Sequence, residues 1–161
     1  LDFDQDGDLD IVMTHGDNSD DTNLLKPYHG VSMFLNQGEF QFERAYFYPM
    51  YGAYKLRVRD YDLDGDQDIV AISFYPDFTD GPDQSLVLLR QDSPLEFHAE
   101  SIPMAAKGRW MVMDAGDIDR DGDEDLVIGS YAMGPGKIPD DVLIAWRRHS
   151  DHLLYLENNS R

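Results

Sequence analysis

Apolar residues in this chain fall into short runs, and the runs come in pairs that recur at wide intervals. Short, bounded runs rich in Val, Ile and Leu are typical of buried β-strands. The paired runs are 11–13 with 31–35, 69–72 with 85–89, and 126–128 with 153–156. We therefore expect two buried strands in each of three segments.

Other segments alternate between apolar and polar residues, which is the pattern of a strand with one face buried. Phe40 and Phe42 alternate with polar residues after the first pair of runs, and 95–100 alternates after the second. The alternating segment 54–59 precedes the second pair, and the apolar segment 110–113 precedes the third. No stretch has a convincing helical period, so these patterns predict an all-β chain.

One acidic motif stands directly before the first run of each pair. It reads Asp-x-Asp-x-Asp-Gly-Asp-x-Asp and begins at Asp2, Asp60 and Asp117, which are 58 and 57 residues apart. Nearly equal spacing indicates one structural unit used three times. About four strands per unit is the content of a β-propeller blade. We predict an all-β, partial β-propeller of three roughly four-stranded blades, over 1–50, 51–105 and 106–161.

The first and last blades are predicted to be incomplete, because the first lacks a strand before its motif and the last lacks its final strand. A propeller needs about four to eight blades to close its ring. Further blades or fused domains are therefore expected outside this sequence. The third blade also departs from the repeat in an extra segment, 142–150, before its third strand.

The acidic motif has the features of a loop that binds a hard cation. Aspartates at alternate positions of a tight turn can converge on one point, and glycine at position 6 accepts the backbone angles this requires. Carboxylates without nitrogen or sulfur ligands select Ca²⁺ or Mg²⁺, and a flexible ring of many oxygens favours Ca²⁺. We predict three Ca²⁺ sites, one per repeat, with position 7 binding through its backbone carbonyl. The predicted ligands are Asp2, Asp4, Asp6, Asp8 and Asp10; Asp60, Asp62, Asp64, Asp66 and Asp68; and Asp117, Asp119, Asp121, Asp123 and Asp125.

Other acidic calcium loops do not fit. A helix-loop-helix EF-hand needs glutamate at position 12, where this chain has Met13, Ala71 and Ile128. The chain contains no cysteine, which excludes cysteine-rich calcium repeats, disulfides and thiolate metal sites. The Gly-Gly-x-Gly-x-Asp period of nonapeptide calcium rolls is also absent.

The net charge of the chain limits the kinds of molecule that it can bind. It carries 32 acidic residues against 13 Lys plus Arg, for a formal net charge of −19. Such a surface repels the phosphates of nucleic acid, which we exclude as a partner. No apolar run approaches the ~18 residues of a membrane span, so no direct membrane insertion is expected. The acids are 26 Asp and 6 Glu, a bias that favours turns and metal loops over a merely solubilising surface.

These loops and the strands after them resemble the FG-GAP and VCBS repeats of integrin-like β-propellers. The segment from Gly116 to Gly129, with its aspartates, its Gly122 and its Leu-Val-Ile strand, is an especially close match. The resemblance implies that each calcium loop joins the first two strands of a blade, on one face of the disc. It also implies an extracytoplasmic location: secreted, periplasmic or at the cell surface.

The resemblance further implies a partner-binding face opposite the calcium loops. The residues expected there are His15, Asp17, Tyr28, His29, Tyr75, Asp77, Arg109 and Trp110. His15 with His29 could form a metal or acid–base pair, although loop histidines are more often only hydrogen-bonded. For Trp110, packing between blades is favoured over stacking on a sugar.

Two functions follow from this sequence. The first is a non-catalytic, calcium-binding module that presents its loop face to a protein or glycan. The alternative is the propeller domain of a polysaccharide-acting lyase or hydrolase, which would need convergent acid, base or nucleophile groups in a cleft. The sequence contains no G-x-S-x-G, HExxH or phosphate-loop motif, which favours the binding module.

Overall fold

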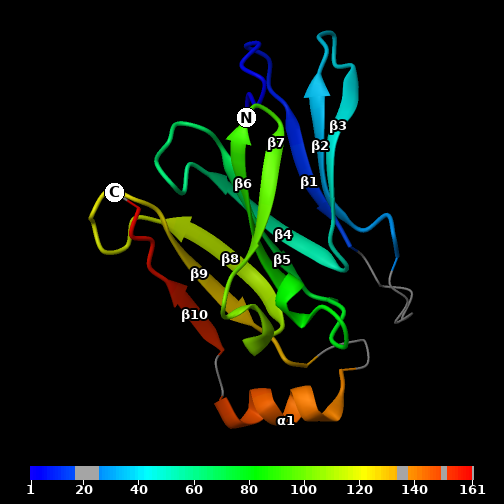
Figure 1. Ribbon diagram of the computed structural model, residues 1–161, viewed down its shortest axis with the longest axis vertical. Coiled ribbons are helices and arrows are strands. Elements are labelled where there is room, and N and C mark those ends of the chain that lie inside the picture. The colour runs from blue at the N-terminus through cyan, green and yellow to red at the C-terminus, as the bar shows by residue number, and fades with distance from the viewer. Residues whose placement is uncertain (17–25, 134–137, 150–151, 161) are drawn as a thin grey trace.

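The computed structural model describes residues 1–16, 26–133, 138–149 and 152–160. Within these ranges the strands form three antiparallel sheets, as Figure 1 shows. The first sheet contains β1 (Ile11–His15), β2 (Gly30–Asn36) and β3 (Phe42–Pro49) in that order. The second contains β4 (Ala53–Arg59), β5 (Asp68–Ser73), β6 (Leu86–Ser93) and β7 (Glu96–Ser101) in that order. The third contains β8 (Trp110–Gly116), β9 (Asp125–Ser130) and β10 (Leu153–Leu156), with β9 in the centre.

This arrangement confirms the predicted all-β class and the partial propeller. Each sheet is a meander in which consecutive strands are neighbours, and the sheets are not closed into a ring. The middle sheet has all four strands of a blade. The first and third sheets have three each among the described residues.

Two apolar clusters hold the three sheets together, and β5 contributes to both. Ile69 and Ala71 pack in the cluster between the first and second sheets, whereas Val70 and Ile72 pack in the cluster between the second and third. Successive side chains of a strand point to opposite faces, so a strand between two neighbouring sheets is apolar at every position. This explains why the sequence of β5 reads as a continuous apolar run.

The outer faces of the first and third sheets remain partly uncovered. On β1, Ile11 and Met13 are exposed, while Val12 packs against the first cluster. On β10, Leu153 and Tyr155 are exposed, while the residue between them is buried. Both outer faces are therefore apolar surfaces of the kind that packs against another sheet or a partner.

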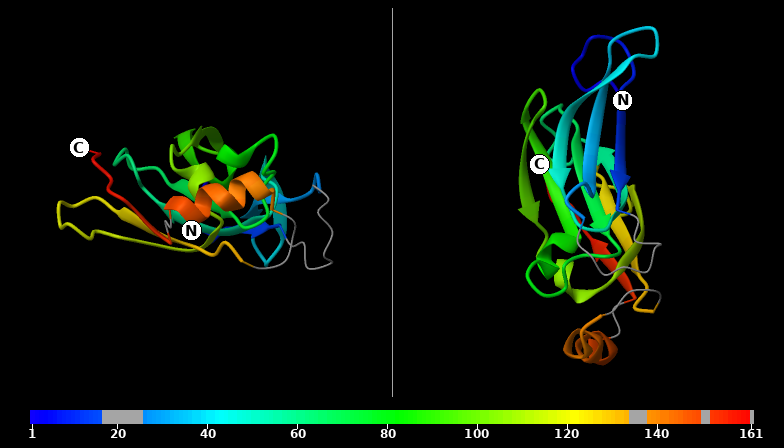
Figure 2. Two further views of the ribbon diagram at one scale, coloured as in Figure 1. Left: turned by 90° about the horizontal axis from the view of Figure 1, so that it is seen from below. Right: turned by 90° about the vertical axis from the view of Figure 1, so that its right-hand side faces the viewer.

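One helix, α1 (Asp140–His149), was not predicted from the sequence. It lies at the end of the molecule away from the acidic loops, in the extra segment before β10 (Figures 1 and 2). The indole nitrogen of Trp146 donates to the carbonyl of Ala106 at 3.1 Å, and its ring packs against Phe78 at 5.7 Å. The expectation of no helix was wrong, because α1 is short and Ile144 is exposed, so the apolar period is weak.

Candidate metal centres

The acidic loops lie at one end of the strands (Figure 1). Loop 1 (residues 2–10) leads into β1, loop 2 (60–68) joins β4 to β5, and loop 3 (117–125) joins β8 to β9. In the second and third blades the loop therefore joins the first two strands, as the resemblance implied. In an antiparallel sheet every second connection emerges at the same end, so one repeated strand order places all three loops together.

The backbone of each loop enters the left-handed region at two positions. At position 6 the φ angles are +96° for Gly7, +100° for Gly65 and +105° for Gly122. A side chain at such an angle is strained, which accounts for the repeated glycine. At position 4 the φ angles are +61° for Gln5, +60° for Leu63 and +68° for Arg120. Sequence reasoning missed this second position, because these three residues have no common side-chain type.

The same side-chain hydrogen bonds occur in every loop. The Oδ1 atom at position 3 accepts from the backbone N–H at position 5, at 3.3, 3.4 and 3.2 Å in loops 1, 2 and 3. The Oδ1 atom at position 5 accepts from the N–H at position 7, at 2.9, 2.9 and 3.3 Å. These bonds turn the carboxylates at positions 3 and 5 toward the inside of the turn.

Position 9 joins each loop to the body of its blade. Asp10, Asp68 and Asp125 are 8%, 1% and 1% exposed. In each of them Oδ2 accepts the N–H of position 2, at 2.7, 2.9 and 2.9 Å. Oδ1 accepts an N–H from the region of the blade's third strand, in Asn36, Gln91 and Asn158, at 2.9, 2.9 and 3.0 Å. Sequence reasoning assigned these aspartates to the metal alone and did not anticipate this second role.

Three carboxylates converge in every loop. In each group one ligand atom per residue lies within 4.8 Å of the others, a spacing that one cation can bridge. The groups are Asp2, Asp4 and Asp6; Asp60, Asp62 and Asp68; and Asp117, Asp119 and Asp121. Outside these groups lie the position 7 side chains (Asp8, Asp66 and Asp123), whose carbonyls were the expected ligands. The predicted side-chain ligands Asp10, Asp64 and Asp125 also lie outside them.

The convergence is electrostatically unfavourable without a cation. Desolvation raises the pKa of the position 3 carboxyls of Asp4, Asp62 and Asp119, and the position 5 carboxylate adds to the rise in each case. Oδ1 of Asp2, a member of the convergent group of loop 1, is buried without a hydrogen-bond partner among the described residues. Both carboxylate oxygens of Asp123 also have no such partner, although this side chain lies outside the group of loop 3. Buried acceptors of this kind are costly unless a donor or a cation satisfies them. The donor set, all hard oxygens, fits Ca²⁺.

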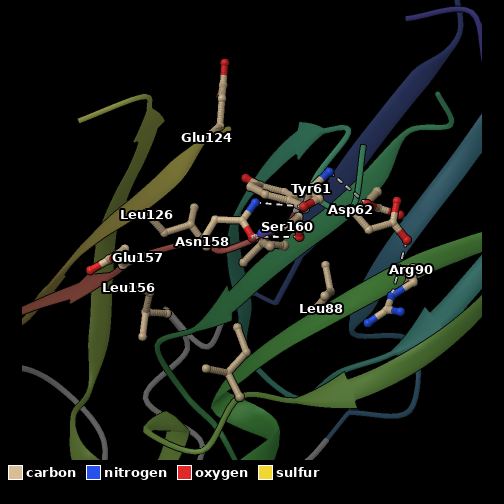
Figure 3. A pocket seen from close by; sticks show the side chains of 13 residues that line it. Tyr61, Asp62, Leu88, Arg90, Glu124, Leu126, Leu156, Glu157, Asn158 and Ser160 are labelled. Carbon is tan, nitrogen blue, oxygen red and sulfur yellow. Dashed lines mark hydrogen bonds and ion pairs between the residues drawn. The ribbon is translucent and has the colours of Figure 1, made fainter. Parts of the chain in front are cut away.

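A pocket of about 300 Å³ lies beside loop 2, between the second and third sheets (Figure 3). Its lining is apolar where Val70, Leu88 and Leu156 contribute, and charged where Asp62 and Arg90 contribute. The Arg90 guanidinium pairs with Glu100 at 2.8 Å through one nitrogen, and its Nε lies 3.7 Å from Oδ2 of Asp62. A predicted metal ligand is therefore already close to a fixed positive charge.

The expected partner face is only partly on the surface. His29 and Arg109 were placed there wrongly, and Trp110 packs between blades, which was the alternative favoured for it. His29, Arg109 and Trp110 are 3%, 0% and 0% exposed. The Arg109 guanidinium lies 3.8 Å from the ring centre of Phe74 and its Nε donates to the Phe74 carbonyl at 2.8 Å. The Trp110 indole packs in the second apolar cluster and donates to the Ala105 carbonyl at 2.8 Å. Packing between the sheets removes these side chains from contact with a partner.

The other residues of the expected face differ in how exposed they are and in what they contact. Tyr28 is 62% exposed, and Tyr75 and Asp77 are half-buried in the connection between β5 and β6. Nε2 of His15 lies 2.8 Å from the Ser32 hydroxyl, and the His29 ring packs edge-on to Tyr28. Asp17 lies outside the described residues.

The repeated blade with its acidic loop defines a β-propeller module. The sequence model of the FG-GAP-like repeat family matches this chain over residues 2–71 and again over residues 60–128. The chain belongs to this family. No curated protein and no solved structure matches the chain. Among the described residues, no helix has the length and apolar character needed to cross a membrane.

Proposed function

We propose that this chain is a calcium-binding, non-catalytic β-propeller module with one Ca²⁺ in each acidic loop. The observation that carries this proposal is that the same hydrogen bonds turn carboxylates inward in all three loops. In every loop the carboxylates of positions 1 and 3 converge with a third one, from position 5 in loops 1 and 3 and from position 9 in loop 2. In a solvated acidic turn without a cation, repulsion between the carboxylates would favour side chains that turn away from one another. The inward geometry, repeated in three loops, is therefore better explained by a bound cation. A divalent cation turns that repulsion into a stabilising interaction.

The residues that would hold each ion follow from the loop geometry. The carboxylates at positions 1, 3, 5 and 9 and the carbonyl at position 7 supply oxygen ligands, and water completes the coordination. Position 9 can serve both the ion and the backbone, because each of its oxygens has two lone pairs. Three ions would change the formal charge from −19 to −13, since each adds two positive charges.

The Asp64→Ala variant tests this proposal. It removes one position 5 ligand from loop 2, and the other loops stay intact. Each independent site contributes its own share of the stabilisation by calcium, so the variant should lose a part of the calcium-induced rise in melting temperature that does not exceed about a third. In chelator its melting temperature should be close to that of the parent chain, as measured by circular dichroism.

The control is Asp83→Ala, which removes the same charge from an exposed residue outside the loops. This variant should keep the full calcium-induced rise. Equal destabilisation by Asp64→Ala with and without calcium would contradict a metal role for this residue. No rise in the parent chain would contradict the whole proposal.

We also propose an extracytoplasmic location, which is typical of FG-GAP repeats. Loops of this kind in extracellular modules bind Ca²⁺ with Kd values of about 10⁻⁴–10⁻³ M, matched to the calcium level outside cells. A calorimetric Kd in this range supports the location, and a submicromolar value would count against it. The exposed apolar faces of β1 and β10 are consistent with further blades packing on both sides.

The loop end opposite the calcium sites is the proposed surface for a protein or glycan partner. Tyr28 and Tyr75 lie there, in the connections after β1 and after β5, and aromatic loop residues often anchor such contacts. Tyr28→Ala should abolish or weaken by at least tenfold any signal on a glycan array or in a pull-down. Phe40→Ala is the control, because Phe40 is 90% exposed in the turn between β2 and β3, at the calcium-loop end. Equal losses from both variants would contradict this surface.

A further inference from the structure

The three loops share their five aspartates and their glycine, but the residue at one equivalent position beside each loop differs in charge. Position 10 of the motif pairs with Phe34 in the first blade, with Leu89 in the second and with Leu156 in the third. In each blade, the residue after this pairing partner comes directly before the residue whose N–H donates to the position 9 aspartate. These equivalent residues are Leu35, Arg90 and Glu157. The loops are thus flanked by a neutral, a positive and a negative residue.

Arg90 is in direct electrostatic contact with its own loop. Its Nε lies 3.7 Å from Oδ2 of Asp62, a position 3 carboxylate in the convergent group of loop 2. This Nε is buried and has no hydrogen-bond partner among the described residues. A second nitrogen of Arg90 pairs with Glu100 at 2.8 Å, which holds the guanidinium on the face of the sheet. Figure 3 shows the contact between Arg90 and Asp62 at the edge of the pocket.

We propose that Arg90 opposes metal binding in loop 2 and makes it the weakest of the three sites. This inference rests on the proposed calcium function. A cation entering loop 2 must take Asp62 away from the guanidinium, and it then lies close to a positive charge that remains fixed by Glu100. The residues at the equivalent positions of the first and third blades are Leu35, which is neutral, and Glu157, which is negative, so neither adds a positive charge there. As calcium rises, loop 2 fills last.

The glycine at position 6 provides a signal from each loop. Gly7 and Gly65 donate their N–H to the position 1 carboxylate, at 3.0 Å in both loops, so these amide resonances should respond to an ion at that carboxylate. In a calcium titration followed by ¹H–¹⁵N NMR, the Gly65 resonance should have a higher midpoint than those of Gly7 and Gly122. Arg90→Gln should lower the Gly65 midpoint about tenfold and leave the other two unchanged. This effect should shrink at high salt, because screening weakens charge–charge repulsion.

Two further variants separate a local effect from a general one. Arg44→Gln removes the same charge from an exposed residue of β3 and should leave the Gly65 midpoint unchanged. Glu100→Gln frees Arg90 to pair with Asp62 and should raise the midpoint. The double variant Arg90→Gln/Glu100→Gln should have the midpoint of Arg90→Gln alone, since Glu100 acts through Arg90.

The outcomes distinguish this inference from the function on which it rests. If calcium moves all three glycine resonances but Arg90→Gln leaves the Gly65 midpoint in place, or shifts all three midpoints equally, the role of Arg90 is overturned. If calcium moves none of the three in the parent chain, the calcium function itself fails. A midpoint for Gly65 at or below the other two in the parent chain would also overturn the proposed order.

Discussion

Replacing Asp68 with alanine is expected to lower the free energy of unfolding by about 4 kcal/mol, even when calcium is chelated. The Asp68 side chain is 1% exposed and accepts the N–H groups of Tyr61 and Gln91, both at 2.9 Å. Alanine leaves both buried donors without an acceptor, and each such loss costs about 1–3 kcal/mol. Urea denaturation in the presence of chelator measures this loss directly.

Asp64→Ala is the matched comparison, because it removes an aspartate of the same loop that bonds only an N–H within the loop. In chelator this variant should lose less than about 1 kcal/mol. Asp68→Asn should be intermediate, since an amide keeps one acceptor oxygen. If Asp68→Ala were no more destabilising in chelator than Asp64→Ala, the proposed link between loop and blade would be wrong.

Trp110→Ala should cost about 4 kcal/mol, because it removes the largest fully buried side chain from the cluster between the second and third sheets. For a chain of this size the melting temperature should fall by about 10 °C. The variant also removes the donor of the 2.8 Å hydrogen bond to the Ala105 carbonyl. Thermal unfolding with and without calcium should give the same loss, since Trp110 is not in a metal loop.

The second tryptophan of the chain provides the control. Trp146 lies on α1, is only partly buried and donates to the Ala106 carbonyl at 3.1 Å. Trp146→Ala should therefore cost less than half as much as Trp110→Ala. Similar losses for the two variants would show that the contact between the second and third sheets does not depend on Trp110.

The strands and the repeat could be predicted from the sequence because their signals are local and periodic. A strand buried on both faces, such as β5, is a continuous apolar run, and a half-buried one, such as β7, alternates. The positive φ of Gly65 could also be predicted, because the motif repeats glycine at this position of a tight turn, where a side chain would be strained. The helix α1 could not be, because its apolar pattern is weak and Trp146 packs against residues far along the chain.

Some features of the candidate sites could likewise be predicted from the sequence, and others could not. The sequence by itself determined which aspartates belong to each loop, since the spacing of one motif repeats three times. Only the tertiary structure decided that Asp68 also supports the backbone, that Arg90 lies beside Asp62, and that Arg109 and Trp110 are buried rather than exposed to a partner. The physical reason is that ligand spacing is a property of one short segment. Burial and charge contacts arise where separate strands and sheets meet, and no single segment of the sequence records their register.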